Sequence, residues 1–218
     1  MNINDILENN YVDLEFKSNK SKMVGKGSIL LDKGKIIVVT AAHCIFDFYS
    51  NCFYKDLYIK HKNEFFKVKS SFIHKDWVNK GVLDYDTGFL ILENSEEIKN
   101  LVPVTPIFNV LQNQEYIIFS KKKRILKSSG NTILQRRSFD DYLYGSSLKG
   151  IAEKTDIGDS GGPWFIKFSG KIYQNSNTSL SFKNSKKVTW GTHWGNEIKM
   201  IYKSIFGDKN DDTIKVDY

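Results

Sequence analysis

Hydrophobic residues occur along this chain in short runs separated by polar turns, and stretches with helical periodicity are few. The runs are rich in Ile, Val, Phe and Tyr, a composition typical of β-strands. Many short strands with turns between them predict an all-β barrel or sandwich. The predicted strands are residues 27–31, 35–40, 57–60, 65–68, 87–92, 116–119, 164–168 and 187–192.

The segments between these runs are less uniform. Residues 32–35 (Asp-Lys-Gly-Lys) join two predicted strands and indicate a hairpin in which Gly34 takes a positive φ. Residues 9–22 are polar and indicate no particular element. Residues 195–206 fit both a helix, with Ile and Tyr on one face, and a final strand.

A connector divides the chain into two parts. Residues 93–109 begin with polar positions and contain Pro103 and Pro106, a pattern typical of a linker. A chain of 218 residues accommodates two small domains packed together. We therefore predict an N-terminal domain of residues 1–105 and a C-terminal domain of residues 106–218.

Composition places the protein among ordinary globular chains, with 40% hydrophobic and 26% charged residues and no apolar run long enough to cross a membrane. The N-terminus has no basic segment followed by an apolar one, so we expect no secretory signal. Only two cysteines occur, Cys44 and Cys52, whereas an extracellular protein usually carries several disulfides. We therefore expect free thiols and a cytoplasmic location. No second pair of ligands is spaced for a metal, so we interpret Cys44 as a small buried hydrophobe.

Positive charge exceeds negative charge along the chain. The 32 Lys and Arg residues against 25 Asp and Glu residues give a net charge of +7, which favours acidic partners or substrates. The densest basic run is residues 121–124, and Arg136 and Arg137 follow it. We interpret these positions as a solvated strand end or loop. No aromatic residues are interleaved for base stacking, so nucleic acid is not expected as a partner.

Three segments contain residues suited to nucleophilic catalysis. A hydroxyl is a poor nucleophile at neutral pH, so it needs a base in contact and an acid that orients the base. Glycines around Ser160 allow the tight turn that would aim the N–H groups of Gly158 and Ser160 at one oxyanion. The segments are residues 38–44 (Val-Val-Thr-Ala-Ala-His-Cys), 84–90 (Asp-Tyr-Asp-Thr-Gly-Phe-Leu) and 158–163 (Gly-Asp-Ser-Gly-Gly-Pro).

The segments Thr-Ala-Ala-His-Cys and Gly-Asp-Ser-Gly-Gly-Pro match the two signatures of the chymotrypsin-like serine peptidases without a mismatch. The chain resembles this family over about residues 24–202, and the order His, Asp, Ser is also that of the family. The resemblance implies two Greek-key β-barrels with the active site in the cleft between them. It also implies that His43, Asp86 and Ser160 form the catalytic triad and that Gly158 and Ser160 form the oxyanion hole.

Two carboxylates compete for the role of triad acid. In the family the acid is followed by an apolar residue, a small residue and two further apolar residues. Asp86 fits this pattern through Gly88, Phe89 and Leu90. Asp84 is followed by Tyr85 and then a charge, so we interpret it as an exposed carboxylate in a turn.

The resemblance also locates the pocket for the residue before the scissile bond. Lys154 stands where trypsin-like enzymes carry an Asp, so a preference for Lys or Arg is not expected. Thr155 follows it, and residues 191–195 (Gly-Thr-His-Trp-Gly) are similar to the pocket strand of glutamyl endopeptidases. We predict that Thr155 and His193 bind the side-chain oxygen of a Glu or Gln residue. The alternative is that His193 is a core histidine and Thr155 an ordinary strand residue.

Two departures from secreted members of the family concern a disulfide and activation. The usual partner of the cysteine after the catalytic His aligns with about Gly25, so that disulfide is absent. No Ile-Val-Gly-Gly sequence is present whose new amino terminus would pair with Asp159. Control by a regulatory protein partner, by a ligand or through intrinsic activity is therefore expected.

Taken together, these patterns predict a serine endopeptidase that acts on protein or peptide substrates, cleaves after Glu or Gln, and uses neither a cofactor nor a metal. A non-catalytic binding module on a protease fold is the first alternative, although an intact triad argues against it. A protease with an added nucleic-acid-binding surface is the second, and salt-dependent binding would test it.

Overall fold

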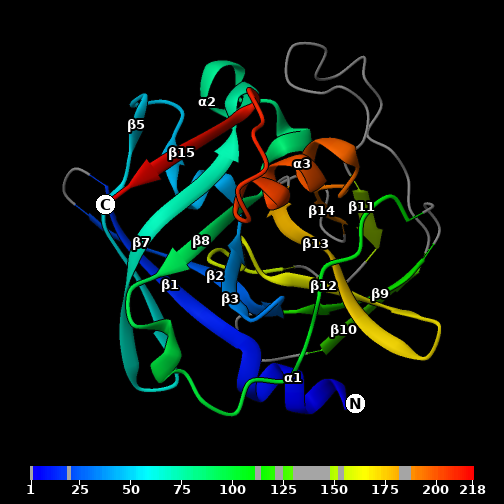
Figure 1. Ribbon diagram of the computed structural model, residues 1–218. Helices are drawn as coiled ribbons and strands as arrows, with labels where there is room; N and C mark the ends of the chain where they lie inside the picture. Colours follow the sequence, from blue (N-terminus) through cyan, green and yellow to red (C-terminus); the bar gives the residue numbers. More distant parts are fainter. Residues whose placement is uncertain are drawn as a thin grey trace.

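The computed structural model describes residues 2–18, 21–110, 114–120, 125–129, 148–151, 155–181 and 188–218. The strands form two large sheets that lie side by side (Figure 1). The first sheet has the order β15-β7-β6-β1-β2-β3-β8, and β8 also pairs with β7, so six of its strands close into a barrel. Its strands are β1 (Tyr11–Ser18), β2 (Ser21–Asp32), β3 (Lys35–Thr40), β6 (Lys55–His61), β7 (Glu64–His74), β8 (Gly88–Leu92) and β15 (Thr213–Asp217).

The second sheet has the order β10-β9-β12-β13-β14-β11, and among the described residues its outer strands β10 and β11 do not pair. It is therefore a curved half-barrel. Its strands are β9 (Glu115–Phe119), β10 (Ile125–Ser129), β11 (Leu148–Ile151), β12 (Pro163–Phe168), β13 (Lys171–Leu180) and β14 (Val188–Gly191). A short hairpin of β4 (Phe46–Asp47) and β5 (Cys52–Phe53) stands apart from both sheets.

Both units wind their strands in the same way. In the first, β1, β2 and β3 are neighbours in chain order and β6 returns to lie beside β1; in the second, β9 pairs with β10 and β12 returns to lie beside β9. This is the Greek-key arrangement. The predicted all-β, two-barrel architecture is therefore confirmed, with the second barrel open between β10 and β11 in the described part of the chain.

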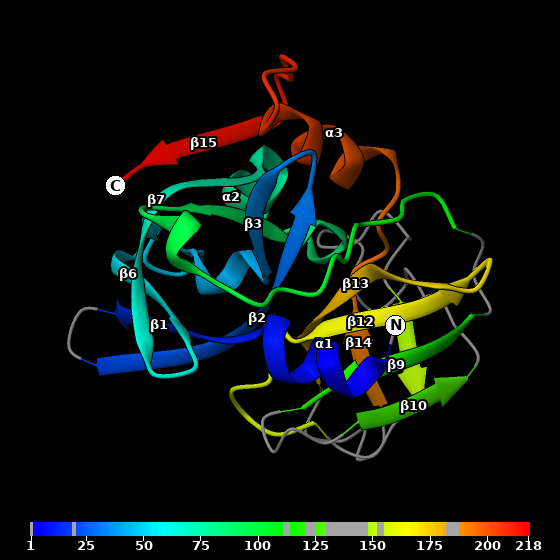
Figure 2. The same ribbon diagram turned by 60° about the horizontal axis from the view of Figure 1, so that its bottom comes forward.

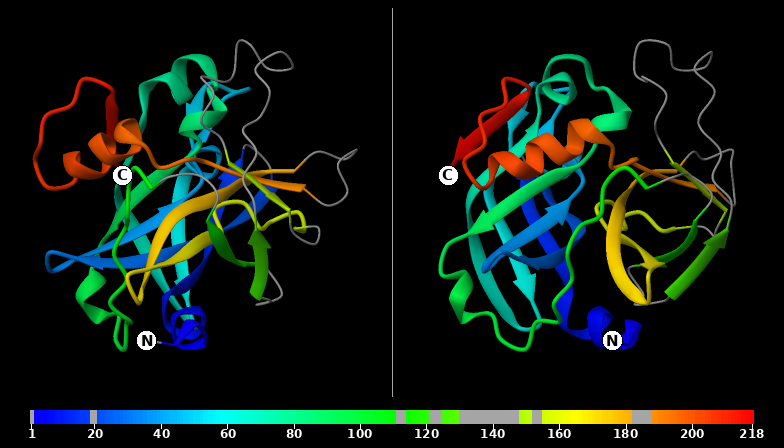
Figure 3. Two further views of the ribbon diagram at one scale, coloured as in Figure 1. Left: turned by 90° about the vertical axis from the view of Figure 1, so that its right-hand side faces the viewer. Right: turned by 45° about the vertical axis from the view of Figure 1, so that its right-hand side comes forward.

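In the described residues, three α-helices and three 3₁₀ turns accompany the sheets. Residues 195–206, which the sequence left open, form a helix that packs on β7 of the first barrel although it follows β14 (Figure 3). No helix in the described ranges is long and apolar enough to cross a membrane. The elements are α1 (Ile3–Asn10), α2 (Lys75–Lys80), α3 (Asn196–Ser204), η1 (Ala42–Cys44), η2 (Leu83–Tyr85) and η3 (Ser95–Glu97).

The hydrophobic core has three parts. One fills the first barrel around Leu14 and Val38, and a small one lies in the second barrel around Trp164. The third joins the two units, because Ile6 of α1, Phe165 of β12 and residues of α3 belong to one cluster. Figure 2 shows α1 below β12 and beside β2, where it covers this junction. Burial of these apolar surfaces fixes the two sheets against each other.

Every predicted strand is present within the described residues, but seven of the fifteen described strands were not predicted, among them β1, β13 and β15. β1 lies in the polar stretch 9–22, and β13 consists largely of polar residues. β15 follows α3 and pairs with β7 of the first sheet, whereas the sequence placed all of residues 106–218 in the second domain. We therefore propose a division in which residues 213–217 belong to the first domain.

Candidate active site

His43 lies where a buried strand ends. β3 runs into Ala41 and Ala42, both 0% exposed, and the chain then turns through η1. Small side chains are needed here because larger ones would clash inside the closed barrel. The imidazole emerges at the barrel edge with a third of its surface exposed.

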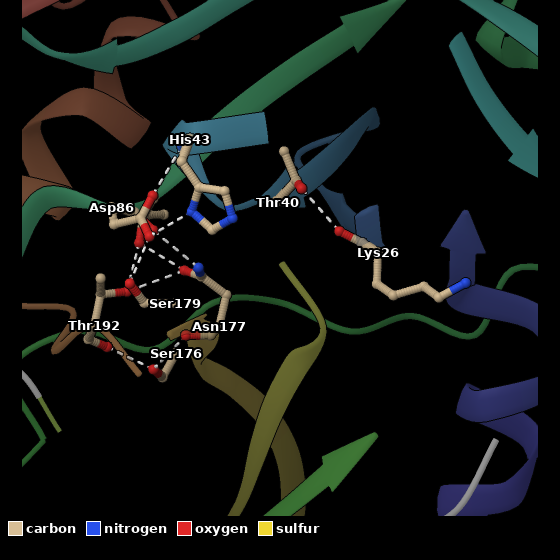
Figure 4. A network of polar contacts seen from close by, with 9 residues as sticks. Lys26, Thr40, His43, Asp86, Ser176, Asn177, Ser179 and Thr192 are labelled. Carbon is tan, nitrogen blue, oxygen red and sulfur yellow. Dashed lines mark hydrogen bonds and ion pairs between the residues drawn. The ribbon is translucent and has the colours of Figure 1, made fainter. Parts of the chain in front are cut away.

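Asp86 lies beneath the imidazole and is almost fully enclosed. Its Oδ2 is 2.8 Å from His43 Nδ1, and its Oδ1 accepts a 2.9 Å hydrogen bond from the backbone N–H of His43. The hydroxyl of Ser179, on β13, donates to Oδ2 at 2.5 Å. Figure 4 shows the carboxylate between the His43 ring on one side and Ser179 and Asn177 on the other. Three hydrogen bonds therefore fix both the position and the orientation of the acid.

For both His43 and Asp86, burial and the contact between the two groups shift the pKa in opposite directions. Burial alone would lower the pKa of His43, but the negative charge and hydrogen bond of Asp86 raise that pKa well above its ordinary value of 6.5. Burial alone would raise the pKa of Asp86, but the charge of His43 and the hydrogen bonds from His43 and Ser179 hold that pKa below its ordinary value. The pair is therefore arranged to stabilise an imidazolium.

A buried polar network supports Asp86 from below. Asn177, which is 0% exposed, donates from Nδ2 to the backbone carbonyl of Asp86 at 3.0 Å. Its Oδ1 accepts hydrogen bonds from the hydroxyls of Thr87 at 2.6 Å and Thr192 at 3.0 Å. Buried polar groups are stable only when they are paired in this way. Residues 174–179 of β13 are all polar and all nearly inaccessible.

Ser160 lies on a tight loop held against the first barrel. The backbone N–H of Lys26 donates to the Ser160 carbonyl at 2.7 Å, and the Thr40 hydroxyl in turn donates to the Lys26 carbonyl at 2.8 Å (Figure 4). Gly161 has φ +84°, and a Cβ there would collide with Lys26 and Thr40 backbone and side-chain atoms. Only glycine fits this position.

The loop also carries the predicted oxyanion donors. Gly158 has φ +94°, and no hydrogen bond between described residues uses the N–H of Gly158 or of Ser160. Asp159, between them, is 1% exposed and accepts the N–H of Asp156 at 2.8 Å, which stabilises the loop from inside.

The three predicted triad residues face one cleft of about 790 Å³. His43, Asp86 and Ser160 all line it, together with Thr155, residues 156–158 and residues 178–181. In this structure no hydrogen bond joins Ser160 Oγ to the His43 ring. Such contacts are often long in the absence of substrate and shorten when substrate binds.

No protein-family model and no curated protein sequence matches the chain. Solved structures do match. A thermostable serine protease, AL20, from an extremophilic microorganism is 18% identical, with a TM-score of 0.74 over 91% of this chain and 97% of that one. The protease Anisep from Arthrobacter nicotinovorans is 20% identical, with a TM-score of 0.71 over 90% and 94%. A Glu endopeptidase is 10% identical, with a TM-score of 0.64 over 92% of each chain.

The chain has the chymotrypsin-like fold. At these identities the likeness concerns the fold, and the chemistry is argued from the site itself.

Of the three residues predicted to form the specificity pocket, only Thr155 is described at the cleft. Thr155 lines the cleft, is 4% exposed, and its hydroxyl is 3.0 Å from the hydroxyl of Thr189 on β14. Lys154 lies outside the described residues. The basic positions 121–124, Arg136 and Arg137 lie outside them as well.

The structure does not bring His193 to Thr155. His193 is absent from the residues that line the cleft, and it lies two positions beyond the end of β14, whereas the Thr155 hydroxyl contacts Thr189 within that strand. Burial lowers the pKa of His193, and the nearest charges are those of Glu197 and Asp84. The predicted pairing of Thr155 with His193 is therefore corrected: β13, and not the segment carrying His193, lies beside Asp86.

Sequence reasoning missed Ser179 and Asn177, which contact Asp86 directly. The polar run 174–179 carries the signal, because it follows a predicted strand closely and contains neither Gly nor Pro. The interpretation of Asp84 as an exposed carboxylate was also wrong. Asp84 is 1% exposed because η2 packs against α2.

Both cysteines are unpaired in the structure, Cys44 buried and Cys52 exposed. A Cβ placed on Gly25 would lie 2.8 Å from the sulfur of Cys44. Gly25 thus occupies the place from which a cysteine would bond to Cys44, as the family resemblance implied. In the part of the chain that the structure describes, no group of three His, Cys, Asp or Glu residues is arranged to hold a metal.

Proposed function

We propose that the chain is a serine endopeptidase that hydrolyses peptide bonds of protein or peptide substrates through an acyl-enzyme. The observation that carries the proposal is the hydrogen-bonded pair of His43 and Asp86, which lines one cleft with Ser160 on a glycine-rich loop. A nucleophile, a base and an oriented acid are the groups that acyl transfer needs.

In the proposed reaction His43 accepts the proton of Ser160 as the hydroxyl attacks the scissile carbonyl. The backbone N–H groups of Gly158 and Ser160 stabilise the oxyanion that forms. Asp86 remains ionised, holds Nδ1 of His43 protonated and stabilises the imidazolium. His43 then gives its proton to the leaving amine, and a water molecule, activated in the same way, releases the acid product.

A digest of a peptide library, read by mass spectrometry, tests this function against the alternative of a binding module. The wild type should generate new termini, and Ser160→Ala should generate none. The two proteins should share a circular dichroism spectrum. Equal cleavage by both, or none by either, would contradict the proposal.

We further propose that the residue before the scissile bond is Glu, with Gln second. The support is the Thr155 hydroxyl at the cleft, the basic Lys154 that precedes it in the sequence, and the shared fold with a Glu endopeptidase. A hydroxyl donates to either oxygen, and a nearby positive charge favours the carboxylate. Thr155, whose hydroxyl is held by that of the buried Thr189, replaces the predicted pair of Thr155 and His193.

Matched peptides that differ only at this residue test the preference. Cleavage after Glu should exceed cleavage after Arg or Phe, and Thr155→Val should reduce it about 10-fold, since one hydrogen bond to a charged group contributes about 1.5–3 kcal/mol. His193→Ala, outside the cleft, should keep the preference. Cleavage after Arg or Phe as fast as cleavage after Glu would contradict the proposed pocket but not the proposed peptidase activity.

The cellular setting belongs to the same proposal. The free thiols favour a reducing compartment, and we propose a cytoplasmic location on that ground.

Asp159 is already bonded within its own loop, so activation by a newly formed amino terminus has no support, and intrinsic activity or control by a partner protein fits better.

A further inference from the structure

Exposed apolar side chains gather at the cleft. Of the eight large hydrophobic residues that are well exposed in the described chain, four line it. They are Met23, Val24, Tyr49 and Ile157, and Tyr49 is 97% exposed. Scattered exposed hydrophobic residues are ordinary, but a group of them at one concave site indicates binding.

Most of these side chains belong to one wall, the apolar groove, which consists of Phe16, Met23, Val24, Phe46, Phe48 and Tyr49. β1 and β2 supply the first three, with Phe16 paired opposite Met23 in the sheet. The β4–β5 hairpin and its turn supply the rest.

The turn that carries Tyr49 has a defined conformation. The Asp47 carboxylate accepts the N–H of Tyr49 at 3.0 Å and the hydroxyl of Ser50 at 2.7 Å. Phe46 packs on Phe53 of β5 at 4.9 Å between ring centroids. The Tyr49 ring is thus presented to solvent by a fixed backbone, and Asp47 is the one charged residue at the groove wall in the described part of the chain.

The groove lies on the leaving-group side of the cleft. Val24 adjoins Gly25, where an added Cβ would lie 2.8 Å from Cys44 Sγ and 3.4 Å from the carbonyl oxygen of Ser160. The other lining residues include Thr155, which precedes the oxyanion loop, and residues 179–181 at the end of β13 in the second sheet. Because His43 must donate its proton to the leaving amine, the departing segment has to extend past His43 along the wall that follows it in the chain.

We propose that the apolar groove binds the substrate residues that follow the scissile bond and selects large aliphatic or aromatic side chains among the first three of them. The inference rests on the proposed peptidase function and specifies its substrates. An acidic residue there meets Asp47 and is disfavoured, whereas Leu or Phe is removed from water against Val24 and Tyr49.

Peptides that are identical up to the scissile bond and differ only after it test the proposal. Peptides with Leu or Phe in the second position should have a kcat/KM about tenfold or more above those with Gly or Asp, from burial of one large side chain. Tyr49→Ala and Val24→Ala should each reduce this ratio about threefold or more. Phe65→Ala removes an aromatic ring that is 55% exposed on β7, away from the groove, and should leave the ratio unchanged.

Labelling with a fluorophosphonate, whose leaving group is fluoride, tests the peptidase function separately from the preference of the groove. If the wild type is labelled at Ser160 but cleaves all peptides alike, or if the groove variants keep the wild-type ratio, the groove proposal is overturned and the peptidase stands. If Ser160 is not labelled and no peptide is cut, the proposed function itself fails and the groove loses its basis.

Discussion

Asp86 is the single residue on which most of the site's hydrogen bonds converge. Replacing it by Asn keeps the shape but supplies an amide, which would hold the wrong tautomer of His43. Asp86→Asn should lower kcat about 10⁴-fold, the magnitude known for the same change in chymotrypsin-type triads. Steady-state kinetics checks this, with the unfolding midpoint as a control for folding. A loss below tenfold would show that Asp86 is not the triad acid.

The raised pKa of His43 determines the pH dependence of the reaction. The base must be neutral to accept a proton, and below its pKa it is already protonated, so activity should fall as pH falls through that value. Because Asp86 raises the pKa of His43 well above 6.5, the acid limb of kcat/KM should have its midpoint above pH 6.5. A profile of kcat/KM against pH measures it. A midpoint at or below 6.5 would contradict the predicted coupling.

Residue-level predictions succeeded where the signal was local. The segments around His43 and Ser160 are contiguous and match motifs whose chemistry is fixed by a few neighbouring residues. His193 was misplaced because its role depended on which of two successive strands lies beside Asp86, and spacing along the chain does not determine that. Ser179, which donates a hydrogen bond to Asp86, was missed because it lies in a run of polar residues that hydrophobic periodicity does not identify as a strand.

At the scale of elements, β13 is the unusual strand. Its polar residues are buried, and Asn177 connects Asp86, Thr87 and Thr192. Pattern rules equate burial with apolar character, so such a strand looks like a loop until its partners are known. β1 was missed for a different reason: Asp13, Glu15 and Lys17 alternate with its buried apolar residues inside a stretch that is polar on average.

The Asn177 network should contribute to both stability and turnover. Asn177→Leu has similar volume but leaves the Asp86 carbonyl without its donor and the hydroxyls of Thr87 and Thr192 without their shared acceptor, which should cost about 1–3 kcal/mol of unfolding free energy. Denaturant unfolding measures this loss, and kcat should fall with it. Lys171→Leu, at an exposed position of the same strand, should stay within about 0.5 kcal/mol of the wild type. Equal effects of the two changes would contradict a role for the network.

For the whole molecule, the two-barrel arrangement followed from the resemblance, because both motifs imply one fold. The return of β15 to the first barrel and the packing of α3 on β7 could not be predicted, since they depend on contacts between distant parts of the chain. Sequence periodicity describes which face of an element is buried and leaves open what covers it.

Whether Cys44 and Cys52 are free thiols also depends on the fold as a whole. With Gly25 opposite Cys44, no disulfide can form there, so the denatured protein should contain two titratable thiols without added reductant. In the native protein Cys52 should react quickly and the buried Cys44 slowly. Titration with a chromogenic disulfide measures both. Fewer than two thiols after denaturation would contradict the free-thiol structure.

The most direct test of the central claim is the identification of the nucleophile by mass spectrometry after fluorophosphonate treatment. A hydroxyl activated by His43 should react, and an ordinary serine should not. We predict a single adduct, on Ser160, that is lost on denaturation before labelling and is reduced at least about 100-fold in rate in His43→Ala. An adduct on another serine, no adduct, or an equal rate in His43→Ala would contradict the account.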